Sequence, residues 1–348
     1  MSTCYPLLFR PIFKEKVWGG RALASLGKAL PPGNIGESWE LADLDSTSAS
    51  GAGGGAEHSL IANGPLAGRS LRDAMHLWRQ DLLGLTRSAG AFPLLIKFLD
   101  AREHLSVQVH PSPDFARQNP AAALKTECWY VLSAQRVDGR DPVIFKGLRP
   151  GVTREGLEQA VRDGRVPDVL QPWPAIVGEC HNLPSGTIHA LGAGVVVAEV
   201  QTPSDTTFRV YDWVREYARP PRALHIRETL ACTLAQDPPP VTRFRTEHPS
   251  EPTRLVTTEF FTVDELRLHA GLSRSLLASP VGVSPAEIHR AHAIVLLRGS
   301  LTLTSDARSF EPLALDAGAT ALLPASIVPD VILTATHDAT LLVVDVLG

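Results

Sequence analysis

The run Leu105-Ser-Val-Gln-Val-His110 alternates apolar and polar residues at every position. Because successive side chains of a β-strand point to opposite faces, its three apolar side chains share one face, and Ser106, Gln108 and His110 share the other. The apolar face would pack into a barrel wall, and the polar face would point into a common space. Taken alone, the run favours an ordinary strand whose polar face meets solvent, but other parts of the chain change that balance.

Short strand-like runs of this kind dominate the chain, and long helical periodicity is scarce. The chain holds 28 Pro and 27 Gly. Many short strands separated by Gly and Pro turns predict a mainly β protein built as a sandwich or barrel. The other clear runs are Leu94 to Phe98, Trp129 to Leu132, Val195 to Val200 and Phe208 to Trp213.

A few helices are expected among these strands. Ser70-Leu-Arg-Asp73 has the spacing of a capping box, with Asp in place of Glu, ahead of apolar residues at helical intervals. Thr153 to Arg162 and His225 to Ala235 are the other expected helices. Ser46 to Ala56 is rich in Ser, Ala and Gly, and we interpret it as a flexible surface loop.

Two Pro-rich stretches, Asp237 to Pro240 and His248 to Pro252, mark a boundary in the chain. We expect an N-terminal β domain over residues 1–240, which carries the short helical insertions, and a C-terminal β domain over residues 253–348.

A faint repeat connects the two expected domains. Gly178 to His189 has Gly and Pro at the same spacing as Gly318 to Pro329, but the second copy ends in proline where the first ends in histidine. The match suggests two related barrels, of which only the first binds metal. A coincidental match between two turns is the alternative.

Glu127 lies in the aromatic strand Glu127-Cys-Trp-Tyr, where an unpaired carboxylate would be costly to bury. Lys125 is on the same face and could pair with it, which is the ordinary explanation. His189 follows Pro184 and Gly186, residues that shape a tight turn. A lone histidine after such a turn is usually a surface residue.

Taken together, these strands offer an amide oxygen, two imidazoles and a carboxylate. Such a mixed N/O set is suited to zinc or another first-row divalent ion. The candidate ligands are Gln108, His110, Glu127 and His189.

Two further strands carry polar residues that suit chemistry beside a metal. In Val195 to Gln201 the interior Glu199 is a candidate acid or base, because desolvation and neighbouring charge can tune its pKa. Arg209 and Lys125 are candidate anion-binding residues, Arg by bidentate hydrogen bonds and Lys as a point charge. For each of them a structural ion pair is the alternative.

Composition and motifs exclude several other classes. The net charge is −4 with no block of like charges, so neither nucleic acid nor an anionic membrane is an expected partner. The sequence shows no secretory signal and no apolar run of about 20 residues. Four scattered cysteines suggest reduced thiols in a cytoplasmic protein, and we expect a monomer or a weak homodimer. There is no G-x-S-x-G, P-loop, dinucleotide or H-E-x-x-H motif.

Over most of its length the chain resembles the type I mannose-6-phosphate isomerases, a cupin-fold family. Each matching segment is modest evidence by itself, but their order and spacing together are specific. The segments are Pro11 to Gly20, Ile35 to Leu41, Leu105 to Pro111, Lys125 to Tyr130, Pro184 to Ala190 and Ser204 to Asp212.

The resemblance implies two cupin jelly-roll barrels, of which the first is catalytic and the second is free of metal. It also implies an enzyme that interconverts mannose 6-phosphate and fructose 6-phosphate through a cis-enediol, with one Zn²⁺ per chain. The implied metal ligands are Gln108, His110, Glu127 and His189. The chain has no room for the large helical domain of longer members, so it resembles the compact bacterial form.

The same resemblance assigns roles around the metal. Arg209 matches the family's active-site arginine, and Lys125 and Ser106 match residues of the substrate pocket. Glu199 falls where an acid/base glutamate is proposed, with a metal-bound water as the alternative base, and Trp18 falls at the pocket edge. The resemblance leaves open whether Gln108 binds the metal directly. Several members place a histidine before the motif lysine, but here the residue is Leu124, so its role is not carried over.

Two other functions compete with this one. A cupin dioxygenase could use the same ligand set around iron, although Arg209 and Lys125 favour a phosphorylated substrate. A non-catalytic bicupin that binds sugar phosphates would fit the second barrel, but it would not explain a fully equipped first barrel.

Overall fold

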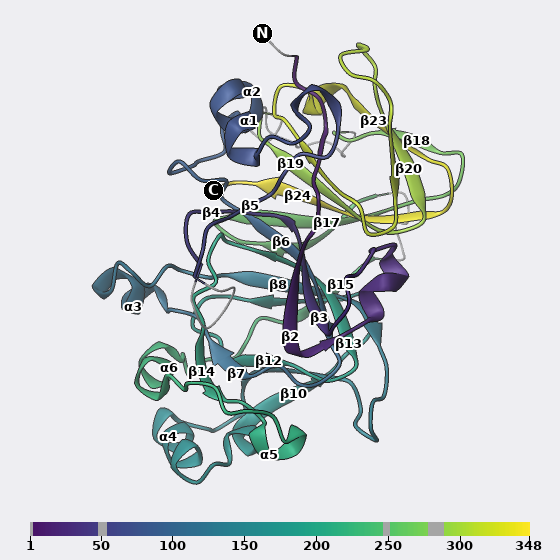
Figure 1. The fold of residues 1–348 in the computed structure, drawn as a ribbon. Coiled ribbons are helices and arrows are strands. Elements are labelled where there is room, and N and C mark those ends of the chain that lie inside the picture. Colours follow the sequence, from purple (N-terminus) through teal and green to yellow (C-terminus); the bar gives the residue numbers. More distant parts are fainter. Residues whose placement is uncertain (1–2, 48–53, 246–250, 278–288) are drawn as a thin grey trace.

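The computed structural model describes residues 3–47, 54–245, 251–277 and 289–348. As predicted, strands dominate and the helices are short (Figure 1). Four larger antiparallel sheets form two jelly-roll units, and a small sheet pairs β4 (Asp43–Leu44) with β5 (Glu57–His58). The loop expected at Ser46 to Ala56 and the Pro-rich stretch His248 to Pro252 lie partly outside the described residues.

The first unit combines a seven-stranded and a five-stranded sheet. The expected strand runs are confirmed, although the strand predicted from Leu105 begins at Val107 and the strand predicted to Trp213 ends at Tyr211. The seven-stranded sheet has the order β15 (Val241–Arg243), β11 (Glu179–Leu183), β8 (Glu127–Ala134), β13 (Val195–Gln201), β6 (Leu95–Ala101), β2 (Ile12–Gly20) and β3 (Ile35–Leu41). The five-stranded sheet has the order β10 (Leu170–Pro174), β9 (Val143–Leu148), β12 (His189–Leu191), β7 (Val107–Val109) and β14 (Phe208–Tyr211).

The second unit combines a six-stranded and a four-stranded sheet. The first residues of the chain contribute to it, because the N-terminal β1 pairs with β22. The six-stranded sheet has the order β1 (Leu7–Leu8), β22 (Thr320–Leu323), β19 (His292–Arg298), β24 (Ala339–Val346), β17 (Phe261–Leu268) and β16 (Thr253–Thr257). The four-stranded sheet has the order β18 (Ser273–Ser275), β23 (Val331–Ala335), β20 (Ser300–Ser305) and β21 (Leu313–Asp316).

The two units repeat one strand order. In the larger sheets, β11-β8-β13-β6 corresponds to β22-β19-β24-β17. The turns also correspond: Thr187 N–H donates to the Pro184 carbonyl at 3.0 Å, and Ile327 N–H donates to the Pro324 carbonyl at 3.0 Å. Gly178 and its counterpart in the second unit both have φ near +90°, a conformation that favours glycine. The spacing match in the sequence therefore reflects the same turn in both units.

The three expected helices form where the sequence predicts them. In α1 (Leu71–Trp78), Asp73 N–H donates to Ser70 Oγ and Ser70 N–H donates to the Asp73 carboxylate, which completes the capping box. None of the described helices is long and apolar enough to cross a membrane. The other helices are α2 (Gln80–Leu83), α3 (Pro113–Gln118), α4 (Arg154–Arg162), α5 (Val214–Tyr217), α6 (Ile226–Cys232) and the 3₁₀ turns η1 (Ala22–Leu26), η2 (Gly64–Leu66), η3 (Val166–Val169) and η4 (Val328–Asp330).

The largest apolar core joins the two units. It includes Phe98 and Ala198 of the first unit together with Val263 and Val295 of the second. Helices α4, α5 and α6 lie at the other end of the molecule, beside the five-stranded sheet (Figure 1). The first unit is therefore supported by the second on one side and by short helices on the other.

Candidate active site

Three side chains from the two sheets of the first unit converge on one point. Glu127 begins β8, His189 begins β12, and His110 directly follows β7. All three are buried, and their ligand atoms lie within 4.8 Å of one another. His110 Nε2 is 3.4 Å from Glu127 Oε2, and His189 Nε2 is 3.2 Å from Glu127 Oε1. In the part of the chain that the structure describes, this is the one group of three His, Cys, Asp or Glu residues that could hold a metal.

Backbone carbonyls fix the orientation of both imidazoles. His110 Nδ1 is 2.9 Å from the Thr206 carbonyl oxygen, and His189 Nδ1 is 2.8 Å from the Thr187 carbonyl oxygen. Since a carbonyl oxygen only accepts, each Nδ1 carries the proton and each Nε2 turns its lone pair towards Glu127. Two such nitrogens and a carboxylate are a donor set typical of zinc and other first-row divalent ions. The residues present therefore fit a divalent metal.

Lys125 lies against this cluster. Its Nζ is 2.6 Å from Glu127 Oε2 and 3.1 Å from His110 Nε2. Burial raises the pKa of Glu127, but Lys125 and His110 outweigh it and hold that pKa well below its usual range. Burial and Lys125 lower the pKa of His110 to about 3. At neutral pH the carboxylate is charged and this imidazole is neutral, which are the forms that bind a metal.

The register of the five-stranded sheet places two more predicted residues beside the cluster. His189 is paired with Gln108, and Gln108 is paired with Arg209. Directly paired residues share a sheet face, so the three side chains form one row. Gln108 Nε2 is 3.2 Å from His189 Nε2. Gln108 therefore adjoins the cluster, and Arg209 lies one strand further away.

A second row crosses the seven-stranded sheet through Trp129, Glu199, Lys97 and Trp39. Trp129 Nε1 donates to Glu199 Oε2 at 2.8 Å, and Lys97 Nζ is 3.2 Å from Glu199 Oε1. Burial lowers the pKa of Lys97, but Glu199 and Glu37 outweigh it and raise that pKa. The buried Glu199 carboxylate is thus held through both of its oxygens.

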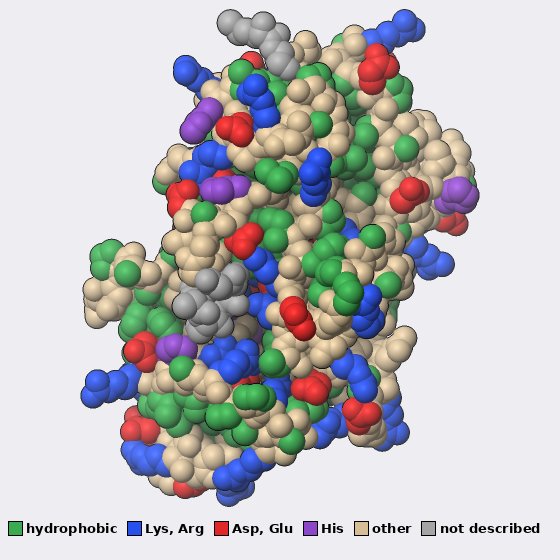
Figure 2. All heavy atoms as spheres, viewed as in Figure 1, with side chains coloured by type: hydrophobic (Ala, Val, Ile, Leu, Met, Phe, Trp, Pro, Cys, Tyr) green, Lys and Arg blue, Asp and Glu red, His purple; other side chains and the backbone are tan. Residues whose placement is uncertain are grey.

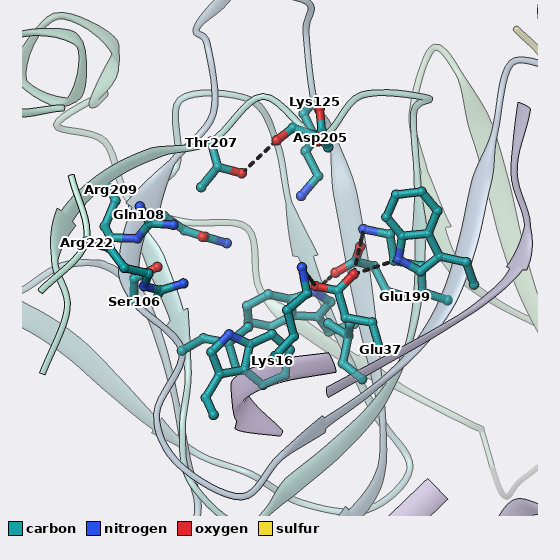
Figure 3. A pocket seen from close by; sticks show the side chains of 16 residues that line it. Lys16, Glu37, Ser106, Gln108, Lys125, Glu199, Asp205, Thr207, Arg209 and Arg222 are labelled. Carbon is teal, nitrogen blue, oxygen red and sulfur yellow. Dashed lines mark hydrogen bonds and ion pairs between the residues drawn. The ribbon is translucent and has the colours of Figure 1, made fainter. Parts of the chain in front are cut away.

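A pocket lies between these rows, and the structure brings every predicted site residue to it or beside it (Figure 3). The metal-binding candidates His110, Glu127 and His189 adjoin it through Gln108 and Lys125. The predicted residues that line the pocket itself are Trp18, Ser106, Gln108, Lys125, Glu199 and Arg209.

Sequence reasoning missed other charged residues of the pocket, among them Lys16, Glu37, Lys97, Asp205 and Arg222. A lysine inside an apolar strand run was a signal for Lys97, because such a charge is buried only with a partner. Burial raises the pKa of Glu37, but Lys16 and Lys97 outweigh it and lower the pKa to about 2. Asp205 and Arg222 come from loops, where the pattern of the sequence carries no comparable signal.

The lining of the pocket is rich in cations. Figure 2 shows Lys and Arg side chains around the hollow near the centre of the face in view. Lys16, Lys97, Lys125, Arg209 and Arg222 contribute to the lining of the pocket. The lining thus has five cations against three carboxylates, Glu37, Glu199 and Asp205, and this excess suits an anionic ligand.

Comparisons with known proteins show which family the chain belongs to. Residues 7–130 match the family described as phosphomannose isomerase type I, catalytic domain. The chain is 34% identical over 280 residues to a mannose-6-phosphate isomerase of Bacillus subtilis, covering 78% of this chain and 82% of the relative. The chain belongs to the type I phosphomannose isomerases. A mannose-6-phosphate isomerase of Streptococcus mutans is also 34% identical, over 74% of this chain and 77% of its own.

The whole fold is shared with this family. The crystal structure of a mannose 6-phosphate isomerase from Bacillus subtilis superposes with a TM-score of 0.76 and 26% identity, covering 97% of this chain and 99% of that one. Both jelly-roll units therefore belong to the phosphomannose isomerase architecture. Enzymes of this type depend on a metal, and His110, Glu127 and His189 form a possible metal site here.

Proposed function

We propose that this phosphomannose isomerase interconverts mannose 6-phosphate and fructose 6-phosphate through a cis-enediol, with one Zn²⁺ per chain. The observation that carries the proposal is the buried cluster of His110, Glu127 and His189 beside a cation-lined pocket. Gln108, whose amide adjoins His189, is the fourth candidate ligand. A bound Zn²⁺ would supply Lewis-acid stabilisation of the negative charge that develops on the sugar oxygens.

The proton transfer is assigned to Glu199. The reaction removes the proton at C2 of the aldose and delivers a proton to C1, so it needs an acid/base group held beside the substrate. Trp129 and Lys97 each contact one oxygen of Glu199, and the residue lines the pocket. These contacts support Glu199 as the base and make Lys97 a positioning residue.

Arg209, Lys125 and Ser106 are assigned to substrate binding, with Arg209 and Lys125 also countering charge in the transition state. All three line the pocket, and Arg209 is almost fully buried. Electrostatic interactions are stronger in such a desolvated place than in water. Trp18, which also lines the pocket, is assigned to its edge.

We propose that the protein is cytoplasmic and that it is a monomer or a weak homodimer. We also propose that the chain divides into a catalytic domain (1–240) and a metal-free domain (253–348). The four cysteines are buried and unpaired, which supports a reducing compartment. The strand order that repeats between the two units supports the division, although β1 (Leu7–Leu8) pairs with a strand of the second unit and β15 (Val241–Arg243) with a strand of the first.

A coupled assay tests the function directly. The purified protein is assayed on mannose 6-phosphate before chelation, after chelation, and after Zn²⁺ is restored, with metal analysis at each stage. We expect turnover to fall with the metal content and to return with Zn²⁺. Absence of turnover by the fully zinc-loaded protein, or full turnover by a metal-free one, would contradict the proposal.

A further inference from the structure

Arg222 is a second arginine on the pocket wall that carries Arg209. Figure 3 shows both arginines on one side of the pocket, near Ser106 and Gln108. Arg222 ends the run Arg219-Pro-Pro-Arg222, which lies between α5 and α6. The wall thus receives one guanidinium from strand β14 and another from the loop that follows α5.

Contacts of Arg219 hold the beginning of this loop in place. Arg219 is buried, its Nη2 donates to the His104 carbonyl oxygen at 2.7 Å, and its guanidinium lies 4.8 Å from the centre of the Tyr217 ring. Two prolines then restrict the backbone between Arg219 and Arg222. Arg222 is therefore presented to the pocket from a constrained segment.

Asp212 sets the direction of the Arg222 guanidinium. Arg222 Nε donates to Asp212 Oδ2 at 2.7 Å, and Arg222 Nη2 donates to Asp212 Oδ1. Asp212 is buried, whereas the Arg222 side chain is 27% exposed. This pair uses one edge of the guanidinium, and the Nη1 group stays outside it.

On the opposite wall of the pocket the charges are matched. Glu37 and Glu199 lie there with Lys16 (Figure 3), and Lys97 also lines the pocket. Lys97 Nζ is 3.2 Å from Glu199, and Lys16 Nζ is 3.3 Å from Glu37. Two carboxylates and two ammonium groups compensate one another, so this wall offers no excess positive charge to a dianion.

The arginine wall has an excess of positive charge. Arg209 and Arg222 bring two guanidinium groups, and Asp212 brings one carboxylate. Burial and the neighbouring Arg222 lower the pKa of Arg209 to about 10, which leaves it protonated at neutral pH. Lys125, another cation of the pocket, is already 2.6 Å from Glu127. A dianion would therefore find its strongest uncompensated charge between the two arginines.

We propose that Arg222 binds the phosphate group of the sugar phosphate together with Arg209, and that Asp212 is the residue that positions Arg222. The proposal deepens the function proposed above and rests on it. Planar guanidinium groups bind phosphate through paired, charge-assisted hydrogen bonds. The pair at this wall would hold the phosphate away from the carboxylates Glu37 and Glu199, and the reacting end of the sugar would then point into the rest of the pocket.

The test compares Arg222→Gln, Arg222→Lys and Asp212→Asn with the wild type. For Arg222→Gln we expect the KM for mannose 6-phosphate to rise by about 10- to 100-fold, the loss typical of one charged hydrogen-bonding group, with kcat nearly unchanged. Arg222→Lys should recover part of the loss, and Asp212→Asn should raise the KM by a smaller factor. Arg254→Gln is the matched control, because Arg254 makes a similar two-bond pair with Asp264 in the second unit.

A second measurement separates this proposal from the isomerase assignment. Calorimetric titration with inorganic phosphate should show weaker binding to Arg222→Gln than to the wild type and to the control. Unchanged phosphate affinity together with unchanged KM, or a fall in kcat at constant KM, would overturn the role of Arg222. Failure of the isomerase proposal would appear instead as an inactive, zinc-loaded wild type, and the phosphate titration would still report on Arg222.

Discussion

The two jelly-roll units have the same strand order, but among the described residues the first buries many more charged side chains than the second. The first unit buries Lys97, Glu127, Glu199 and Arg209 on strands. The β20–β23 strand pair of the second unit buries aliphatic residues such as Leu301, Leu303 and Leu333. One strand arrangement therefore holds either a charged site or an ordinary apolar core, and the side chains alone decide which.

The corresponding turns show the difference at a single position. His189 and Pro329 follow the same Pro-initiated turn at the same spacing. The histidine brings an imidazole to Glu127, whereas proline has no ligand atom in its side chain. The apolar core that spans both units suggests why the second unit is retained: it supports a neighbour whose own interior is occupied by charges.

The largest effect is expected at this turn. His189→Ala should remove the bound metal and lower kcat by more than about 100-fold. Loss of a residue that only hydrogen-bonds to a metal ligand already lowers metal affinity or activity by about 10- to 100-fold. Pro329→Ala, at the matching place in the second unit, should leave both unchanged. Metal analysis and the isomerase assay are the measurements. Full metal content in His189→Ala would show that His189 is no more important for metal binding than Pro329.

The next largest effect is expected where Lys97 pairs with Glu199 and Glu37. Lys97→Met leaves Glu199 and Glu37 without their shared partner, and removal of one member of a buried ion pair costs about 3–5 kcal/mol. Urea unfolding measures this loss. Replacing Arg254 by Gln breaks the more exposed pair with Asp264 in the second unit and should cost about 1 kcal/mol or less. Equal losses would show that burial of the pair does not matter.

The apolar core of the second unit should respond in stability alone. Leu333 is fully buried, and Leu333→Ala should cost about 2–5 kcal/mol through lost contacts and a cavity. Zinc content and kcat of the folded variant should match the wild type. A loss of metal from the folded variant would mean that the second unit takes part in the site directly.

The stability of the protein should fall in acid because of a histidine in the first unit. Burial, with Arg140 and Arg219, lowers the pKa of His104 from 6.5 to about 4, and its Nδ1 accepts from Ala193 N–H. The native state therefore prefers neutral His104, so this contribution is complete above pH 6.5 and is lost as the pH falls towards 4. The loss is at most about 3 kcal/mol. Unfolding of His104→Leu should depend less on pH over this window, and an unchanged pH dependence would contradict the prediction.

The sequence was informative where local pattern and chemistry coincide. Strict alternation placed Gln108 and His110 correctly, and the capping box at Ser70 marked the start of α1. Lys97 and Arg222 were missed for different reasons. The first is paired across strands that are distant in sequence, and the second is placed by a loop whose path depends on tertiary contacts.

We propose that the first unit binds a metal and that the second does not. Anomalous diffraction at the zinc edge from crystals of the purified protein tests it most directly. We expect one peak per chain, about 2.0–2.2 Å from His110 Nε2, His189 Nε2 and a Glu127 oxygen. A peak elsewhere in the chain, or none in a zinc-loaded active protein, would contradict it.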